Sequence, residues 1–235
     1  MKARPVYYSI AVLLIMAPGF SEAQKKKKRR PKPALKQIDD VADLPRVLLI
    51  GDSISIGYTL PTRALLKDKA NVHRIPTNGG DTKKGLASLD TWLGKGRWDV
   101  IHFNWGLHDL KYLNQKRQLA GPETGKHMNT IDQYKKNLRQ LVQRLIKTGA
   151  KLIWASTTPV PEGSGGRVKG DAAKYNEVAA RIMKEEGVTV DDLYSFAMTR
   201  LDKIQRPANV HFTPAGSKEL AKQVAGHISK ALQKK

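Results

Sequence analysis

RVLLIGDSISIGYTL, residues 46–60, begins as an apolar run and ends in residues that can start a helix. Between the two parts stand Gly51, Asp52 and Ser53. A strand that turns directly into a helix is typical of α/β folds, which hold their ligands beyond the carboxyl ends of the strands. The stretch therefore predicts that the hydroxyl of Ser53 lies at that edge of a sheet as a candidate nucleophile.

Outward from this stretch, short apolar runs alternate with amphipathic segments. The apolar runs predict five strands, at residues 47–50, 72–75, 100–103, 152–155 and 188–190. The amphipathic segments predict five helices, at residues 54–66, 83–93, 131–147, 171–186 and 217–232. Strict alternation predicts an α/β domain, a flavodoxin-like three-layer α/β/α sandwich with a five-stranded parallel sheet.

The first residues have the pattern of a secretory signal. Lys2 and Arg4 precede the mostly apolar residues 6–20, and small residues stand before a cleavage point after Ala23. The apolar segment is shorter than the roughly 20 residues of a membrane span. We therefore expect residues 1–23 to be removed and the protein to be secreted or periplasmic. Anchoring by an uncleaved signal stays open, because basic residues follow at once.

Positive charge is concentrated just after this segment. The chain has a net charge of +21, and residues 25–36 carry eight Lys or Arg and no acid. We expect residues 24–37 to be a disordered basic linker before a domain at residues 38–235. The run from Lys25 to Lys36 is either solvated or associates with an anionic polymer or membrane surface. Nucleic acid is not expected as a partner, because no aromatic-rich face accompanies the charge.

Polar residues recur where a parallel sheet places its ligands. Residues 78–80 follow the second predicted strand, and residues 106–109 follow the third. His211 precedes the last helix, which Thr213 and Pro214 are expected to start. The chain has no cysteine, so a thiolate nucleophile or thiolate metal site is excluded. No metal or organic cofactor is implied.

This order of motifs resembles the SGNH hydrolases, the GDSL-type esterases and lipases, from about Arg46 to Leu232. The resemblance implies that Ser53 is the nucleophile and His211 the general base. It also implies an oxyanion hole formed by the N–H groups of Ser53 and of Gly79 or Gly80 within Asn78-Gly79-Gly80.

Two positions depart from the family pattern. His108 stands where the family has the asparagine of its oxyanion hole, and we assign the same role to His108 because an imidazole N–H can also donate. Ala208 stands where the family has the aspartate that orients the base. The carbonyl of Ala208, the side chain of Asn209, or Asp202 or Asp109 in space are the alternatives for that role.

Other residues near the motifs have supporting or binding roles to be tested. Asp52 is expected to order the nucleophile turn, and Asn104 to brace it. Trp105 either stacks on a sugar ring or belongs to the core, and His102 is expected in the core rather than on a metal with His108. Basic loop residues are either solvated or line a cleft that favours an anionic substrate: Lys83, Lys84, Arg167, Lys169 and Arg206.

The sequence thus predicts a secreted serine ester hydrolase that removes acetyl groups from a carbohydrate. A lipid or thioester hydrolase at anionic membranes is the first alternative. A non-catalytic glycan-binding module, with a site degenerate at Ala208, is the second.

Overall fold

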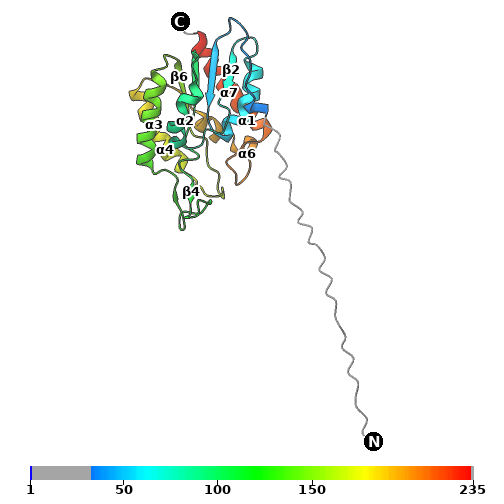
Figure 1. The fold of residues 1–235 in the computed structure, drawn as a ribbon, viewed down its shortest axis with the longest axis vertical. Helices are drawn as coiled ribbons and strands as arrows, with labels where there is room; N and C mark the ends of the chain where they lie inside the picture. The colour runs from blue at the N-terminus through cyan, green and yellow to red at the C-terminus, as the bar shows by residue number, and fades with distance from the viewer. Residues whose placement is uncertain (2–32, 234–235) are drawn as a thin grey trace. The chain divides into compact units, whose positions relative to one another are not determined.

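The structure is a computed structural model that describes Met1 and residues 33–233. Residues 33–233 belong to one compact unit, which Figure 1 shows. Apart from Met1, the predicted signal peptide at residues 1–23 lies outside the described residues, as does most of the basic linker at residues 24–37. The boundary near residue 38 stays a prediction.

The centre of this unit is a parallel sheet of five strands in the order β2-β1-β3-β6-β7. In that order the strands are Asn71–Arg74, Arg46–Ile50, Val100–Phe103, Lys151–Ala155 and Thr189–Asp191. The direction of winding reverses between β1 and β3, where such sheets open a crevice at their carboxyl ends. The flavodoxin-like sandwich predicted from the sequence is confirmed.

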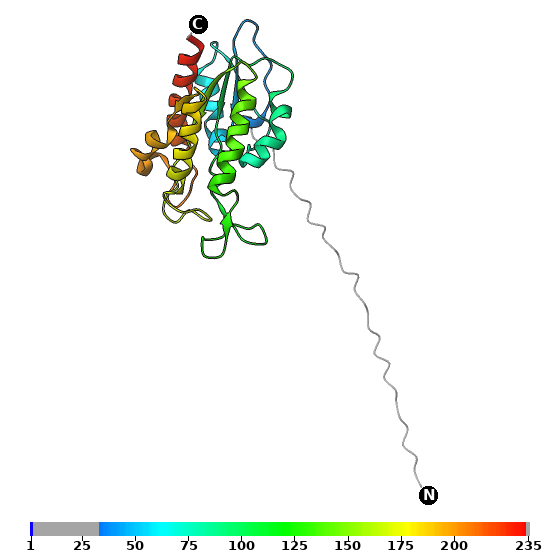
Figure 2. The ribbon, with the colours of Figure 1, turned by 90° about the vertical axis from the view of Figure 1, so that its left-hand side faces the viewer.

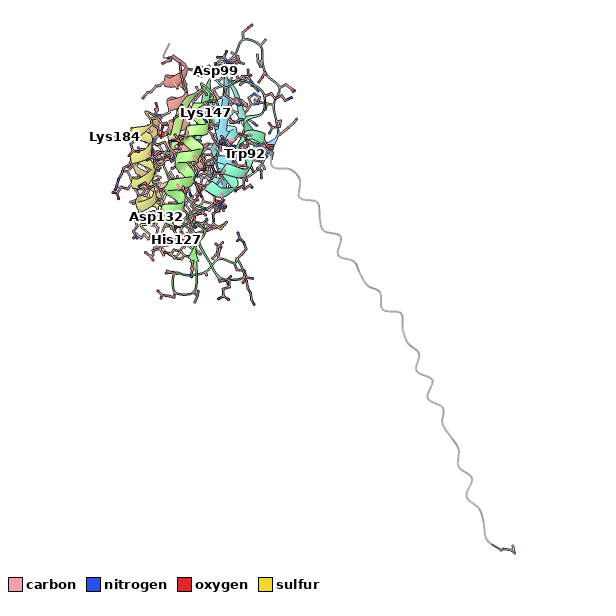
Figure 3. The ribbon with its side chains drawn as sticks, turned by 60° about the vertical axis from the view of Figure 1, so that its left-hand side comes forward. Trp92, Asp99, His127, Asp132, Lys147 and Lys184 are labelled. Carbon is pink, nitrogen blue, oxygen red and sulfur yellow. The ribbon has the colours of Figure 1, made fainter. Side chains whose placement is uncertain are left out.

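Helices cover both faces of the sheet. On one face lie α1, α5, α6 and α7, with bounds Ser53–Leu65, Leu193–Met198, Leu201–Ile204 and Pro214–Gln233. On the other face α2, α3 and α4 lie side by side, at Thr82–Leu93, Ile131–Ile146 and Asp171–Glu185, as Figures 2 and 3 show. A capping box of Thr130 and Gln133 starts α3. No helix among the described residues is long and apolar enough to cross a membrane.

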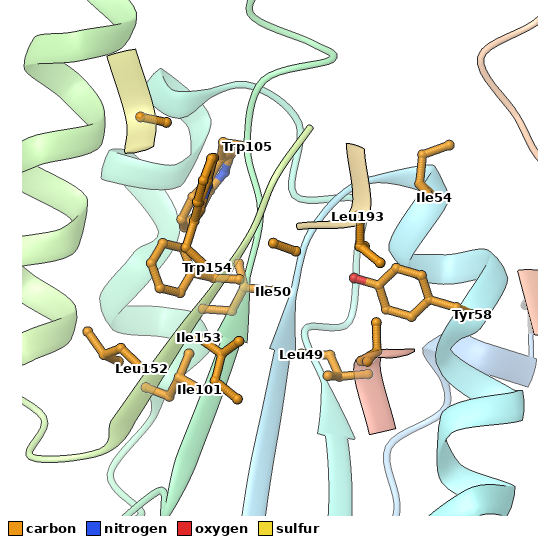
Figure 4. Close-up of a cluster of buried hydrophobic side chains, with 14 of the residues drawn as sticks. Leu49, Ile50, Ile54, Tyr58, Ile101, Trp105, Leu152, Ile153, Trp154 and Leu193 are labelled. Carbon is orange, nitrogen blue, oxygen red and sulfur yellow. The ribbon is translucent and has the colours of Figure 1, made fainter. Parts of the chain in front are cut away.

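Fully buried side chains fill the space on both sides of the sheet. In Figure 4, Leu49 lies on the side of Tyr58, whereas its neighbour Ile50 lies on the side of Trp154. All four are at most 1% exposed. Burial of one such side chain stabilises the fold by about 1.5–3 kcal/mol. The ends of the central strands, from which the candidate site rises, are therefore held by the core.

A hairpin between β3 and α3 is not predicted by the sequence pattern. Its strands are β4 (Tyr112–Leu113) and β5 (Lys126–His127), paired antiparallel. The hairpin lies at the end of the unit toward which the parallel strands run, as β4 in Figure 1 shows. The main-chain N–H of Tyr112 donates to Gly166 O at 2.7 Å. Two-residue strands carry no apolar periodicity, so the pattern gave no signal for them.

A short 3-10 helix, η1 (Pro33–Leu35), precedes the sheet. The main chain then reaches β1 past residues that pack along β2, where Val41 N donates to the side chain of Asn71 at 2.9 Å. This contact ties the segment before β1 to the edge strand β2.

Candidate active site

The turn that carries Ser53 is ordered by the residue before it. Asp52 is the N-cap of α1, and its Oδ1 accepts the N–H of Ile54 at 2.9 Å. Ser53 is the first residue of α1, so its own N–H is among those that a helix leaves without an intrahelical acceptor. This hydrogen bond is the contact expected of a residue that orders the turn.

Arg74, at the end of β2, holds the same turn from beneath. Its Nη2 donates to the carbonyl oxygens of Gly51 and Asp52, both at 2.9 Å. The side chain is only 1% exposed. Burial lowers the pKa of Arg74 to about 10, so the guanidinium is charged at neutral pH. Sequence reasoning missed this residue, although a cation inside a predicted buried strand was a usable signal.

The hydroxyl of Ser53 meets the imidazole of His211 across 158 positions of sequence. The distance from Ser53 Oγ to His211 Nε2 is 2.9 Å. On the other side of the ring, His211 Nδ1 lies 2.8 Å from Asn209 Oδ1. The same oxygen accepts the main-chain N–H of His211 at 2.9 Å. With Nδ1–H donating to Asn209, Nε2 carries the lone pair that accepts the hydroxyl proton of Ser53.

Asn209 is therefore the orienting partner of His211 among the alternatives left open by the sequence. Ala208 has a φ of +48° and is exposed. Asp202 is exposed on α6. An amide oxygen fixes the tautomer of the imidazole as a carboxylate does, but it brings no negative charge to stabilise the imidazolium.

Asp109 accepts hydrogen bonds from residues other than His211. Its Oδ1 accepts the N–H and the hydroxyl of Thr82, at 3.0 and 2.5 Å, and the amide of Asn129 at 2.7 Å. Burial raises the pKa of Asp109 to about 7, against these donors, which favour the carboxylate. Asp109 thus joins the loop after β3 to the start of α2, and it is a supporting residue rather than a partner of His211.

The two glycines predicted as oxyanion donors have different surroundings. Gly79 N–H donates to Gly51 O at 2.9 Å, and a Cβ at Gly79 would lie 2.8 Å from that oxygen. Gly79 is therefore required for close packing of two loops. Gly80, with a φ of +66°, donates its N–H to Asn78 Oδ1 at 2.9 Å. Because a side-chain acceptor can rotate away, Gly80 is the remaining candidate donor of the pair.

His108 is half-buried beside the nucleophile turn. Burial lowers the pKa of His108, the nearby cations Lys111 and Arg167 act in the same direction, and the carboxylate of Asp52 acts against them. The imidazole is therefore neutral at neutral pH and keeps an N–H to donate. This state fits the oxyanion role assigned to His108 from the sequence.

Three further predictions concern the strand ends. Trp105 is 1% exposed and packs near Phe103, so of its two alternatives the core position fits the structure and stacking on a sugar does not. Asn104 donates its side-chain N–H to Ala155 O at 2.7 Å, which braces β3 against β6 rather than the serine turn. His102 is fully buried, with its Nε2 3.0 Å from Asp191 Oδ2, as expected of a core residue.

Among the described residues, no group of three or more potential ligands is arranged to hold a metal ion.

An open groove of about 680 Å³ adjoins the pair of Ser53 and His211. It runs along α1 and the start of α7, and its lining includes Ile56, Leu60 and Pro61. Arg206 and Lys218 add positive charge to the same lining. The groove gives a substrate access to the hydroxyl of Ser53.

The arrangement has the parts that acyl transfer requires. A hydroxyl is hydrogen-bonded to an imidazole, the imidazole is oriented by a second acceptor, and the hydroxyl belongs to the first residue of a helix. These groups supply a nucleophile, a proton acceptor and stabilisation for a developing oxyanion.

Comparison with protein-family models gives a match to the GDSL-like lipase/acylhydrolase family over residues 49–218. The match includes Ser53, Gly80, His108 and His211. No curated protein sequence matches the chain.

Solved structures share the fold over most of their length. The acetyl xylan esterase AlAXEase is 17% identical, with a TM-score of 0.64 over 78% of this chain and 99% of its own. A lipase/acylhydrolase from Enterococcus faecalis is 18% identical, with a TM-score of 0.66 over 80% and 96%. An acetylxylan esterase from Geobacillus stearothermophilus is 18% identical, with a TM-score of 0.62 over 81% and 95%. At these identities the likeness establishes the fold alone.

Proposed function

The chain belongs to the GDSL-like lipase/acylhydrolase family and is an SGNH-type serine ester hydrolase, and on that premise we propose that Ser53 and His211 are its nucleophile and general base. The 2.9 Å approach of Ser53 Oγ to His211 Nε2 is the observation that carries the proposal. Asn209 gives the imidazole an orienting partner, so the alanine at position 208 does not leave the base unsupported. The non-catalytic alternative rested on that alanine.

The proposed reaction has two steps. Ser53 Oγ attacks the acyl carbon while His211 Nε2 takes the hydroxyl proton, and the same proton then goes to the leaving alcohol as its C–O bond breaks. Water next attacks the acyl-serine, His211 takes a proton from that water, and Ser53 leaves with the proton as the acid is released. The N–H groups of Ser53 and Gly80, with the imidazole N–H of His108, stabilise the oxyanion in both steps.

The proposed substrate is an O-acetylated carbohydrate. The groove beside Ser53 is open along α1 and α7, which suits an extended polymer more than an enclosed acyl chain. Two of the solved structures with this fold are described as acetylxylan esterases, which supports the same chemical class. Export by the predicted signal peptide, with cleavage near Ala23, is part of the proposal, because polymeric carbohydrate lies outside the cell.

A lipid or thioester hydrolase is the second candidate, and one observation favours it. The groove is partly lined by apolar side chains, among them Ile56 and Leu60, and Leu60 is 44% exposed. Such a strip could bind an acyl chain. The length of the preferred acyl group separates the two candidates.

The test is hydrolysis of p-nitrophenyl esters of increasing chain length, together with release of acetate from acetylated xylan. The proposal predicts highest kcat/KM for the acetyl ester, a fall as the chain lengthens, and loss of activity in Ser53→Ala. Ser88→Ala, on α2, serves as a matched control that keeps activity. Strong hydrolysis of long-chain esters with none of the acetyl ester would reject the carbohydrate proposal.

A further inference from the structure

Arg167 lies on the loop between β6 and α4 and is half-buried beside the candidate active site. Its Nε donates to Leu107 O at 2.9 Å, the residue before His108. Its Nη1 donates to Gly165 O at 3.4 Å. These bonds fix the guanidinium in place, but neutral carbonyl oxygens leave its positive charge uncompensated.

Lys111 is a second half-buried cation in the same corner, just before β4. Burial lowers the pKa of both Lys111 and Arg167. Arg167 also lowers the pKa of Lys111, and both cations lower the pKa of His108. The two cations and the candidate oxyanion donor thus share one electrostatic environment next to the nucleophile turn.

Neither cation has an ion-pair partner among residues 33–233. The carboxylates that attract them are already engaged, because Asp52 caps α1 and Asp81 caps α2. Partial removal of a cation from water costs free energy unless an opposite charge offsets it. Two such cations beside His108 and its loop can therefore receive an anion that arrives with the substrate.

Resting on the esterase function proposed above, we propose that Arg167 and Lys111 form a subsite for an anionic group on the sugar that carries the ester. The substrate class is then an O-acetylated acidic carbohydrate, with a carboxylate or a sulfate close to the acetyl group. With Nε held by Leu107, the Nη groups of Arg167 present the planar fork that binds carboxylate and sulfate oxygens well. Lys111 adds a point charge.

The wider charge distribution agrees with this class of substrate. Residues 37–235 contain 32 Lys or Arg and 20 Asp or Glu. Lys83 and Lys84 stand in the first turn of α2, and Arg206 and Lys218 line the groove on the other side of Ser53. A field of one sign around a site raises the rate at which oppositely charged molecules arrive, and salt weakens it.

The experiment compares acetyl monoesters of three glycosides. They are a neutral methyl glucoside, the methyl glucuronoside that carries a carboxylate, and a methyl glucoside that carries a sulfate. At low ionic strength the wild type should show at least a tenfold higher kcat/KM for one of the anionic esters than for the neutral ester. Arg167→Gln should bring this ratio close to one, mainly through KM, and Lys111→Gln should lower it less. The matched control, Lys169→Gln, removes an exposed charge from the same loop and should keep the ratio.

A wild-type ratio near one would overturn the proposal. An equal loss of the ratio in Lys169→Gln would also overturn it, because overall charge rather than a subsite would then explain the preference. Failure to hydrolyse any of the esters, or p-nitrophenyl acetate, would instead reject the proposed esterase site. In that case calorimetric binding of unacetylated methyl glucuronoside decides the subsite: binding by the wild type that Arg167→Gln abolishes supports it, and no binding rejects it.

Discussion

Ser53 and His211 face each other from two regions that are built differently. The turn of Ser53 is tied to the sheet by the buried Arg74 and is capped by the buried Asp52. His211 is exposed on a loop, and one side chain, that of Asn209, accepts from both its ring and its main chain. The position of the nucleophile is thus a property of the core, whereas the orientation of the base is a local property of a loop. Changes on the first side should affect unfolding, and changes on the second should affect activity alone.

Arg74→Met should give the largest effect on stability. The substitution removes two hydrogen bonds from a charged donor to the turn, and the free energy of unfolding should fall by about 2–3 kcal/mol, with activity falling as well. Urea denaturation measures this change. Arg63→Met is the matched control, because Arg63 also donates to carbonyl oxygens but lies away from Ser53. If Arg74→Met has the same free energy of unfolding as the wild type, the turn of Ser53 is not held by the core as described.

Asp109, which is buried like Arg74, should make the free energy of unfolding depend on pH. Folding raises the pKa of this acid to about 7, so the folded protein binds its proton more tightly than the unfolded chain. The resulting stability is complete below about pH 4 and is lost as the pH rises to about 7, by about 2 kcal/mol between pH 5 and pH 7. Asp109→Asn should remove this part of the dependence in denaturation series at several pH values. Asp132→Asn, at an exposed position, should retain it.

Much of the sheet was predictable because it depends on local pattern, and the roles of Ser53 and His211 followed from the resemblance of the motif order to the SGNH hydrolases. Apolar runs of four or five residues mark strands buried on both faces, and Asp52 and Thr213 mark helix starts. The hairpin of β4 and β5 and the buried Arg74 were not predictable in the same way. Their roles come from contacts between distant segments, which leave no periodic trace in sequence. Trp105 shows the same limit, since its ring packs against Gly85 of α2, where a Cβ would lie 2.9 Å from it.

On the base side, Asn209→Ala should reduce kcat by about tenfold to fiftyfold, because the imidazole loses the acceptor that fixes its tautomer. This is less than the roughly 10⁴-fold loss known for a buried carboxylate partner, since an amide contributes no charge. The unfolding curve should stay that of the wild type. A loss of stability like that of Arg74→Met would mean that the loop of His211, like the turn of Ser53, is held by the core.

Ala208→Asp should have the smallest effect and leave kcat within about tenfold of the wild type. Asn209 already accepts from His211 Nδ1, and position 208 has a φ of +48°, a conformation that aspartate tolerates. Steady-state kinetics on p-nitrophenyl acetate measures the change. A rise well beyond tenfold would show that an amide is an inadequate partner for the base in this site.

Ester hydrolysis at this site depends most directly on whether the Ser53 hydroxyl is activated by His211. Labelling with a fluorophosphonate, followed by mass spectrometry of the labelled peptide, measures this. The wild type should be modified at Ser53 alone, Ser53→Ala should not react, and His211→Ala should react at least a hundredfold more slowly. A wild type that stays unlabelled while a control esterase reacts, or labelling that persists in Ser53→Ala, would contradict the account.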